Sequence, residues 1–254
     1  MKILVCIKRV PNTGARILLT EDQQEINTRN LGFVISPHEE CAVEEAIQIV
    51  EKFGGESTVL TLGPEVANEQ LRDSLAMGVN RAILLDNGGA DWGAIATAGA
   101  IVTAVRAEKE NGTDFDLILF GNESADSGGF QVGIRVGYEL DLPCVTGIKD
   151  LEIKDGKAIA KRDAGGGFEV FEVTLPAVFT VREGINLPRF RTMPGRLRAK
   201  KVEIPAQTPE QKSGDMEKLR LVIPPEQGST VEILGEGPAA APKIVEILKE
   251  LELV

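Results

Sequence analysis

The sequence predicts an α/β protein, a doubly wound three-layer domain of the Rossmann-like type. Three observations predict it. Short apolar runs alternate with helical patterns over the first 140 residues, the rhythm changes to antiparallel strands after Pro143, and eight of the thirteen prolines lie at or after Pro188. The first observation is typical of buried parallel strands joined by helices. The other two predict an antiparallel hairpin extension and an extended C-terminal arm.

The first half of the chain supplies four buried strands and the helices between them. Each strand is apolar on both faces and is rich in β-branched or aliphatic residues: 3–7, 57–62, 81–86 and 115–120. Helical patterns cover residues 37–53, 65–77, 92–110 and 128–140. The first of these helices begins with Ser36 as N-cap, Pro37 at its first position and Glu39 completing a capping box. Such alternation predicts right-handed crossovers.

The second half begins with strands that alternate polar and apolar residues at 149–153, 157–162 and 168–174, around turns at Asp155-Gly156 and Gly165-Gly166-Gly167. Residues 176–181 form one more buried strand. We therefore divide the chain into an α/β domain of residues 1–185, a loop of residues 186–201 and an arm of residues 202–254 that ends in a short amphipathic helix. Such an arm buries too little surface to fold alone, so we expect it to lie across a partner or its own body.

The formal charge is uneven along the chain. There are 28 basic and 39 acidic side chains, a net charge of −11, yet residues 182–201 hold seven Arg or Lys and a single acid, Glu183. This local charge of +6 leaves −17 elsewhere, which argues against a protein that coats nucleic acid or anionic membrane. A nucleic-acid interface at the basic segment stays an alternative, with only Phe190 nearby to stack on bases.

Rare residues exclude several kinds of site. A single histidine, His38, rules out a multi-histidine metal centre, and Cys6, Cys41 and Cys144 lack the spacing of zinc or iron-sulfur ligands. We expect no metal. No run of 18 apolar residues is present, and the apolar N-terminal run is too short for a signal peptide. The expected protein is cytoplasmic and reduced, neither secreted nor membrane-spanning.

The loops after the strands are where an open α/β sheet binds ligands. The loop after the fourth strand, residues 121–131, is rich in small and hydroxyl residues and leads into a helix. Its backbone N–H groups at a helix start suit a phosphate, although a flexible turn is an equally good interpretation. The loop matches neither a Walker motif nor G-x-G-x-x-G after the first strand.

Single residues give weaker signals. A solvated or capping role is favoured over catalysis for His38, and a core role over a nucleophilic one for Cys6. No carboxylate pair is singled out by its spacing, so acid-base hydrolysis is unsupported. Met193 stands in a basic, Pro-rich loop without a periodic apolar face, and partner contact is slightly favoured over a buried local role.

Together these residues resemble a known family. Lys8-Arg9-Val10, Ala42-Val43-Glu44-Glu45-Ala46, Gly63-Pro64, Ser74-Leu75-Ala76-Met77-Gly78, the 121–133 loop and Asn186-Leu187-Pro188-Arg189-Phe190 follow the order of the electron-transfer flavoprotein beta subunit, over residues 1 to about 204. The resemblance implies an adenine-nucleotide-binding α/β fold. It also implies a heterodimer with an alpha subunit that holds most of the FAD, and a carrier of electrons from flavin dehydrogenases to a quinone reductase or other acceptor.

The resemblance implies a nucleotide pocket with the following cofactor-binding residues: Cys6 through its backbone, Ser36, Gly63, Ser127, Gly128, Gly129, Phe130, Gln131 and Val132. Ser36 stands where many members have Asn. Phe130 and Val132 stand where AMP-binding members often have Asn and Thr, so this loop offers backbone N–H groups and Gln131. In most members the pocket holds a structural AMP, whereas electron-bifurcating members hold a second FAD there.

The same resemblance makes residues 189–201 a recognition loop for donor dehydrogenases, with Met193 as the apolar anchor. The partner-binding residues are Met193, Arg189, Arg191, Arg196, Arg198 and Lys200, and no residue is catalytic. A flexible thioether fits several pockets, while a basic rim speeds encounter. Two alternatives remain: an electron-bifurcating subunit with its own FAD, and a stand-alone AMP- or ATP-binding stress-type protein.

Overall fold

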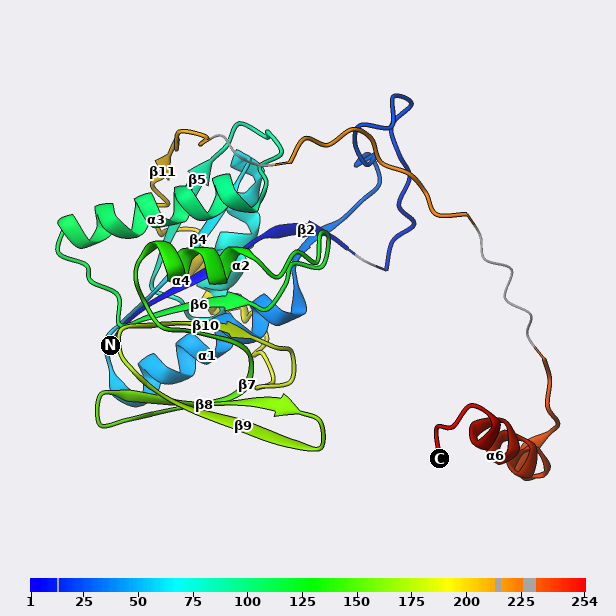
Figure 1. The fold of residues 1–254 in the computed structure, drawn as a ribbon. Helices are drawn as coiled ribbons and strands as arrows, with labels where there is room; N and C mark the ends of the chain where they lie inside the picture. The colour runs from blue at the N-terminus through cyan, green and yellow to red at the C-terminus, as the bar shows by residue number, and fades with distance from the viewer. Residues whose placement is uncertain (13, 213–215, 226–231) are drawn as a thin grey trace.

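A nine-stranded sheet forms the centre of the molecule (Figure 1). The computed structural model describes residues 1–12, 14–212, 216–225 and 232–254. The strand order is β11-β5-β4-β1-β6-β10-β7-β8-β9, and the strands from β11 to β7 are parallel. Their bounds are β1 (Lys2–Ile7), β4 (Glu56–Gly63), β5 (Arg81–Asp86), β6 (Leu117–Gly121), β7 (Cys144–Lys154), β8 (Lys157–Ala164), β9 (Gly167–Thr174), β10 (Ala177–Val181) and β11 (Ala206–Gln207).

Helices cover both faces of this sheet. Two separate apolar clusters lie on its two sides, one lined by α1, α2 and α5, the other by α3 and α4. The helices are α1 (Pro37–Phe53), η1 (Glu65–Ala67), α2 (Asn68–Met77), α3 (Ala94–Glu110), α4 (Val132–Glu139), α5 (Met193–Ala199), η2 (Gly237–Ala240) and α6 (Ala241–Glu250). The predicted doubly wound, three-layer α/β class is confirmed.

The antiparallel extension is continuous with the main sheet. Strand β8 pairs antiparallel with both β7 and β9, around turns in which Asp155, Gly156 and Gly165 adopt positive φ. Strand β7 pairs in parallel with β10, which lies between it and β6. The hairpin therefore extends one edge of the main sheet and does not form a separate layer.

Two short strands, β2 (Arg9–Pro11) and β3 (Phe33–Ile35), form a small antiparallel sheet just beyond the end of β1. Arg9 pairs with Ile35, and its guanidinium stacks on Phe33 at 3.3 Å from the ring centroid. Because Ser36 follows Ile35 directly, this pairing sets the start of α1 beside the carboxyl end of β1.

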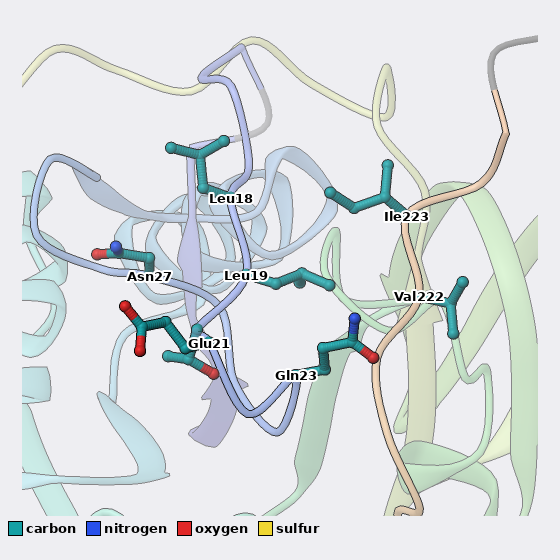
Figure 2. Close-up of a pocket in the computed structure, with 8 residues that line it drawn as sticks. Leu18, Leu19, Glu21, Gln23, Asn27, Val222 and Ile223 are labelled. Carbon is teal, nitrogen blue, oxygen red and sulfur yellow. The ribbon is translucent and has the colours of Figure 1, made fainter.

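The C-terminal arm runs beside a hairpin of residues 19–26 that projects from the body (Figure 1). The Leu221 N–H donates to the Gln23 carbonyl at 2.8 Å, and Gln24 Nε2 donates to the Leu219 carbonyl at 3.0 Å. Between them is a cavity of about 510 Å³ lined by Leu18, Leu19 and Ile223 among others (Figure 2). Helix α6 follows with no buried residue. Parts of the predicted arm, 213–215 and 226–231, lie outside the described residues.

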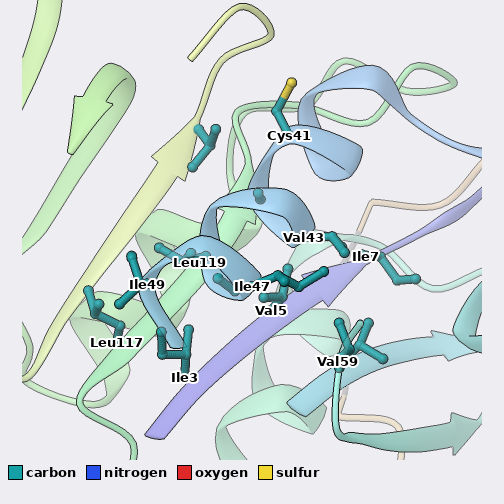
Figure 3. Packing of buried hydrophobic residues seen from close by; sticks show 14 of the residues in the cluster. Ile3, Val5, Ile7, Cys41, Val43, Ile47, Ile49, Val59, Leu117 and Leu119 are labelled. Carbon is teal, nitrogen blue, oxygen red and sulfur yellow. The ribbon is translucent and has the colours of Figure 1, made fainter. Parts of the chain in front are cut away.

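The core that supports the first strand is tightly filled. Val5 and Ile3 of β1 lie against Ile47 and Val43 of α1, with Leu119 of β6 alongside (Figure 3). All five are at most 3% exposed. Burial of such side chains contributes about 1.5–3 kcal/mol each. The strands β1 and β6 are therefore held by a fully buried part of the core.

The structure differs from the predicted elements at three places. Helix α4 begins at Val132 and not at residue 128, because Gly128 and Phe130 adopt φ of +55° and +54°, which a helix does not allow. The helix predicted from residue 65 begins with the 3₁₀ turn η1. The predicted 186–201 loop contains the helix α5, whose N-cap Thr192 accepts a hydrogen bond from the Gly195 N–H.

Candidate functional site

The carboxyl ends of β1 and β6 form the edge at which a sheet of this order is expected to bind a ligand. Strand β1 has β4 on one side and β6 on the other, so the chain order reverses direction here. At such a switch point the loops at the carboxyl ends part and leave room for a ligand. Lys8 follows β1, the 121–131 loop follows β6, and Ser36 begins α1 at the same edge. The structure thus places Ser36 and the 121–131 loop, two parts of the predicted pocket, at the same edge as Lys8.

Ser36 carries the clearest sign of a missing partner. Its side chain is fully buried, and its Oγ has no hydrogen-bond partner among the described residues. The predicted capping box was therefore wrong in its first half, since the Ser36 hydroxyl caps no N–H of α1. A buried hydroxyl without a partner costs free energy. Its position at the positive end of a 17-residue helix makes it a fitting contact for a polar ligand group.

The loop residues Gly129 to Gln131 present backbone N–H groups that have no acceptor within the described chain. Two turns of the loop are held internally, by the Gly128 N–H donating to the Ser124 carbonyl and by a 2.8 Å contact between the Ser124 and Ser127 hydroxyls. Within the described chain no acceptor bonds to the N–H groups of Gly129, Phe130 or Gln131. Nothing lies within 4 Å of where a Gly129 Cβ would be. The loop is open and rich in donors.

The side chains of the same loop offer fewer free hydrogen-bonding groups to a ligand than its backbone does. Phe130 is 51% exposed, and the Gln131 side-chain oxygen accepts hydrogen bonds from Arg135 Nε and Nη2 at 3.2 and 2.9 Å. Val132 is the first residue of α4. Gln131 is thus already engaged by its own helix, which leaves the backbone as the main source of donors.

Cys6 and Gly63 line the same edge as backbone positions. Cys6 pairs with Leu60 of β4 and Phe120 of β6, and Gly63 ends β4. Burial raises the pKa of the Cys6 thiol far above its usual range, and the Glu39 carboxylate adds to this effect. The thiol stays protonated, so Cys6 is a small buried core residue and not a nucleophile.

Glu39 is a buried acid at this edge of the sheet that the sequence patterns assigned to the capping box. Its Oε2 accepts a 2.9 Å hydrogen bond from the Lys8 N–H. A Cβ at position 121 would lie 2.6 Å from the Glu39 Cγ, so Gly121 makes room for it. Burial raises the pKa of Glu39 to about 8, although the Lys8 and Ser36 N–H groups oppose the rise. Near neutral pH this carboxyl is therefore mostly uncharged.

His38 connects the two loops on either side of the pocket, a role that sequence reasoning missed. The Glu183 N–H donates to its Nδ1 at 2.7 Å, and its Nε2 lies 3.4 Å from Glu123 Oε1. The Nδ1 acceptor role assigns the remaining proton to Nε2. The expected solvated or capping role was wrong: His38 ties the 121–131 loop to the start of the basic segment.

The basic segment of residues 182–201 is anchored on the acidic faces of α1 and α2. Arg189 contacts Glu44 and Glu51, and Arg191 contacts Glu40 at 2.7 Å and Asp73 at 2.8 Å. The Glu51 and Glu44 carboxylates raise the pKa of Arg189 further above its ordinary value. These two arginines, predicted as partner contacts, are engaged within the chain.

The remaining basic residues differ from this pair. Arg198 Nη2 donates to the Leu75 carbonyl at 2.8 Å, which secures α5 against α2. Arg196 and Lys200 form no ion pair with the described part of the chain and are exposed. Met193 begins α5 and is 69% exposed, with Phe190 95% exposed nearby in the sequence. The segment presents apolar side chains next to unpaired positive charge.

Searches for other kinds of site gave two negative findings. Among residues 1–12, 14–212, 216–225 and 232–254, no three His, Cys, Asp or Glu side chains are grouped so as to hold a metal ion. None of the helices in that same part of the chain is long and apolar enough to cross a bilayer.

The order of the parallel strands and the helices on both faces of the sheet define a Rossmann-like α/β protein. A family model described as electron transfer flavoprotein domain matches residues 25–212. The chain belongs to the electron transfer flavoprotein family, and the similar curated proteins are named as its beta subunits.

Two of these relatives span nearly the whole chain. The beta subunit of Bacillus subtilis is 33% identical over 260 residues, 98% of this chain and 98% of the relative. That of Syntrophomonas wolfei is 35% identical, over 98% and 96%. A third, the caffeyl-CoA reductase-Etf complex subunit CarD of Acetobacterium woodii, is 36% identical over 77% and 73%. The resemblance drawn from the sequence motifs is confirmed, and with it an electron-transfer role.

Proposed function

We propose that this chain is the beta subunit of a heterodimeric electron-transfer flavoprotein. Its alpha partner would hold most of the FAD, which when bound supplies the capacity to accept and release electrons. This chain would accept electrons from flavin dehydrogenases through that FAD and pass them to a quinone reductase or other acceptor. No residue of this chain would be catalytic, because its work is to bind a nucleotide, orient the partner and dock the donor.

The observation that carries the nucleotide site is the unpartnered Ser36 hydroxyl at the carboxyl ends of β1 and β6. The residues there fit an adenine nucleotide. The open N–H groups of Gly129, Phe130 and Gln131 would hold a phosphate, Ser36 would bind a polar ligand atom, and the backbone at Cys6 and Gly63 would line the pocket. We propose a structural AMP as occupant, together with the loop residues Ser127, Gly128 and Val132.

Donor docking is proposed for the exposed part of the basic segment. Met193 is the apolar anchor, and Arg196 and Lys200 are exposed and form no close ion pair within the described chain, although Arg196 also acts on Asp73 electrostatically. Arg189, Arg191 and Arg198 would act indirectly, by holding that segment in place. The three cysteines are unpaired, which favours a reducing compartment such as the cytoplasm.

The test is a count of cofactors. The chain is co-expressed with its alpha subunit, the purified complex is denatured, and released FAD and AMP are quantified per heterodimer. One FAD and one AMP support the proposal. A colourless homo-oligomer carrying ATP or AMP would contradict it and favour the stand-alone alternative.

An electron-bifurcating subunit is the second candidate. One relative is named as a subunit of a caffeyl-CoA reductase-Etf complex. In addition, Phe130 and Val132 add no polar side-chain donor to the loop. In the same count, two FAD and no AMP would favour this candidate.

A further inference from the structure

His38 lies between two segments that are far apart in the sequence. It stands in the first turn of α1, and its side chain is 20% exposed, so water can reach the ring. Its Nδ1 accepts a 2.7 Å hydrogen bond from the Glu183 N–H, at the start of the basic segment of residues 182–201. Its other nitrogen, Nε2, lies 3.4 Å from Glu123 Oε1 in the 121–131 loop. The ring therefore contacts both segments from one position on α1.

The number of protons on the imidazole decides which of these contacts it can make. A neutral ring with its proton on Nε2 accepts at Nδ1, as the Glu183 contact requires. A protonated ring carries an N–H on both nitrogens and has no acceptor left, and rotating it by a half turn does not restore one. Two N–H groups would then face each other across 2.7 Å, so the Glu183 contact must open. The contact with Glu123, in contrast, becomes an ion pair.

Charged groups face the ring from the side of the sheet edge. Glu123 is the nearest, and its carboxylate favours a positive charge on the ring, whereas the positive end of α1 opposes one. Glu39 follows His38 directly on α1, and burial raises its pKa to about 8. Lys8, whose backbone N–H contacts Glu39, has its ammonium 2.6 Å from Asp126 Oδ2, so this pair adds little net charge.

The remaining charged groups beside His38 come from three elements: Glu40 of α1, Arg182 and Glu183 of the turn after β10, and Lys149 of β7. Glu40 is already paired with Arg191. Groups of these types do not ordinarily gain or lose a proton between pH 5 and pH 8, whereas a histidine does. Glu39 and Glu45, whose pKa burial raises, are the competing groups in this range.

We propose that His38 is a proton-operated link between the 121–131 loop and the basic segment. Neutral His38 holds the Glu183 N–H and so fixes the first turn of the basic segment, whereas protonated His38 releases it and pairs with Glu123. The release is local, because Asn186 and Arg189 keep the following residues on α1. Mild acid therefore loosens residues 183–185 and tightens the 121–131 loop. The link operates whichever nucleotide or donor the chain binds.

The full-length chain offers a direct readout, because His38 is its single histidine and the ring signals in NMR spectra are therefore unambiguous. Ring and backbone amide signals are followed from about pH 8 to about pH 5, the range in which an imidazole ordinarily gains its proton. The Glu183 amide signal should change with the same midpoint as the ring. The Glu123 amide signal should change with it, because the loop gains an ion pair as the turn loses a hydrogen bond.

Two variants separate the acceptor from the ring. His38→Asn places an amide oxygen where Nδ1 lies, so it should hold the Glu183 N–H at every pH and abolish the response. His38→Phe keeps a ring without an acceptor, so exchange of the Glu183 amide with solvent should be about tenfold faster than in His38→Asn at one fixed pH.

Two further variants test the neighbouring acids. Glu123→Gln should retain the response of the Glu183 amide and lose that of the 121–131 loop, because the ring then has no carboxylate to pair with. Glu39→Gln is the control for the competing buried acid, and the response of the Glu183 amide should persist in it.

Three results would overturn the link. One is a Glu183 amide that does not respond while the ring titrates, and another is a ring that gains no proton before the protein unfolds. The third is a Glu183 response that persists in His38→Asn or is lost in Glu39→Gln, since Glu39 or Glu45 would then cause it. Where a His38 variant does not fold, the wild-type titration decides: a shared midpoint of ring and Glu183 amide supports the link, and separate midpoints reject it.

Discussion

Arg189 forms a two-pronged ion pair with Glu44 of α1. Its Nε lies 2.9 Å from Glu44 Oε2, its Nη2 lies 3.0 Å from Oε1, and its own N–H donates to Oε2 at 3.1 Å. The Glu44 side chain is 4% exposed, so Arg189 neutralises the charge of a nearly buried carboxylate. Arg189, a partner contact according to the family resemblance, instead holds the basic segment of residues 182–201 to α1.

Replacing Arg189 should destabilise the protein by leaving that carboxylate unpaired. Arg189→Met should lower the free energy of unfolding by about 2 kcal/mol. Combining it with Glu44→Gln should recover part of the loss, since the buried charge is then gone. Denaturant unfolding of the single and double variants measures both, with Arg196→Met as the control for an unpaired arginine. Equal losses for Arg189→Met and Arg196→Met would show that the pair contributes nothing.

Gly195 should tolerate no side chain. A Cβ there would lie 2.2 Å from the Ala76 carbonyl oxygen, which is backbone of α2 and cannot move aside. Gly195→Ala should therefore displace α5 and cost about 1–3 kcal/mol in unfolding experiments. We also expect slower reduction by the donor dehydrogenase with nucleotide content unchanged. Gly32→Ala, which lies outside the proposed nucleotide site, is the control with free space around it. A Gly195→Ala protein as stable as wild type would contradict the packing of α5 on α2.

Met193 should matter for docking and not for folding. Because its side chain is 69% exposed, Met193→Ala should leave stability and flavin content unchanged. Loss of an apolar anchor should slow reduction by the donor dehydrogenase about tenfold. Stopped-flow reduction of the heterodimer measures this, and Met193→Leu should restore most of the rate. The anchor assignment is wrong if donor kinetics do not change.

Ser36→Ala should separate a cap from a ligand contact. Loss of a capping side chain costs roughly 1 kcal/mol, but the Ser36 hydroxyl makes no capping bond. The empty protein should therefore unfold with nearly unchanged free energy, or with a small gain. AMP affinity should fall about tenfold. Calorimetric titration and denaturation of the same preparation give both values, and a stability loss with unchanged AMP affinity would contradict the assignment.

Glu39 should make stability fall as pH rises. Its pKa is about 8 in the folded protein against an ordinary 4.5, so between these values the folded state keeps a proton that the unfolded state has released. Stability therefore decreases across this window, with a slope of up to about 1.4 kcal/mol per pH unit from this one group. Below pH 4.5 both states are protonated and the slope vanishes.

The variant Glu39→Gln removes this titration. Its free energy of unfolding relative to wild type should improve steadily from pH 5 to pH 8. A difference that does not vary with pH would mean that Glu39 ionises normally. Glu45, whose pKa burial also raises, adds a similar dependence to both proteins and so cancels in the comparison.

Sequence patterns predicted the layers of this fold well, because buried parallel strands such as 81–86 are apolar on both faces and helices such as α1 carry strong end signals. They failed where tertiary contacts decide. Phe130 at positive φ delays the start of α4, and Thr192 begins a helix in a segment whose prolines suggested a loop.

The candidate site was predicted as a set of positions but not as a set of interactions. Placing Ser36 and the 121–131 loop at one edge follows from the strand order. The roles of Glu39, His38 and Asp126 depend on distances between loops far apart in the sequence, which no local pattern encodes. The same holds for Arg189 and Arg191: composition counts their charge, and only the folded chain shows that α1 and α2 neutralise it.

The chain between β10 and β11, which contains the basic segment of residues 182–201, is anchored in the sheet at both ends. It leaves β10 near the middle of the sheet and returns to it at the edge strand β11, which pairs with β5, so four strands lie between its two ends. A surface stretched between two such supports loses little conformational freedom when a partner arrives. The hydrogen-bonded strands at both ends would also restrain movement of the segment when a dehydrogenase docks. If this segment docks an electron donor as proposed, it would do so as a surface already held in place by the sheet and not as a flexible linker.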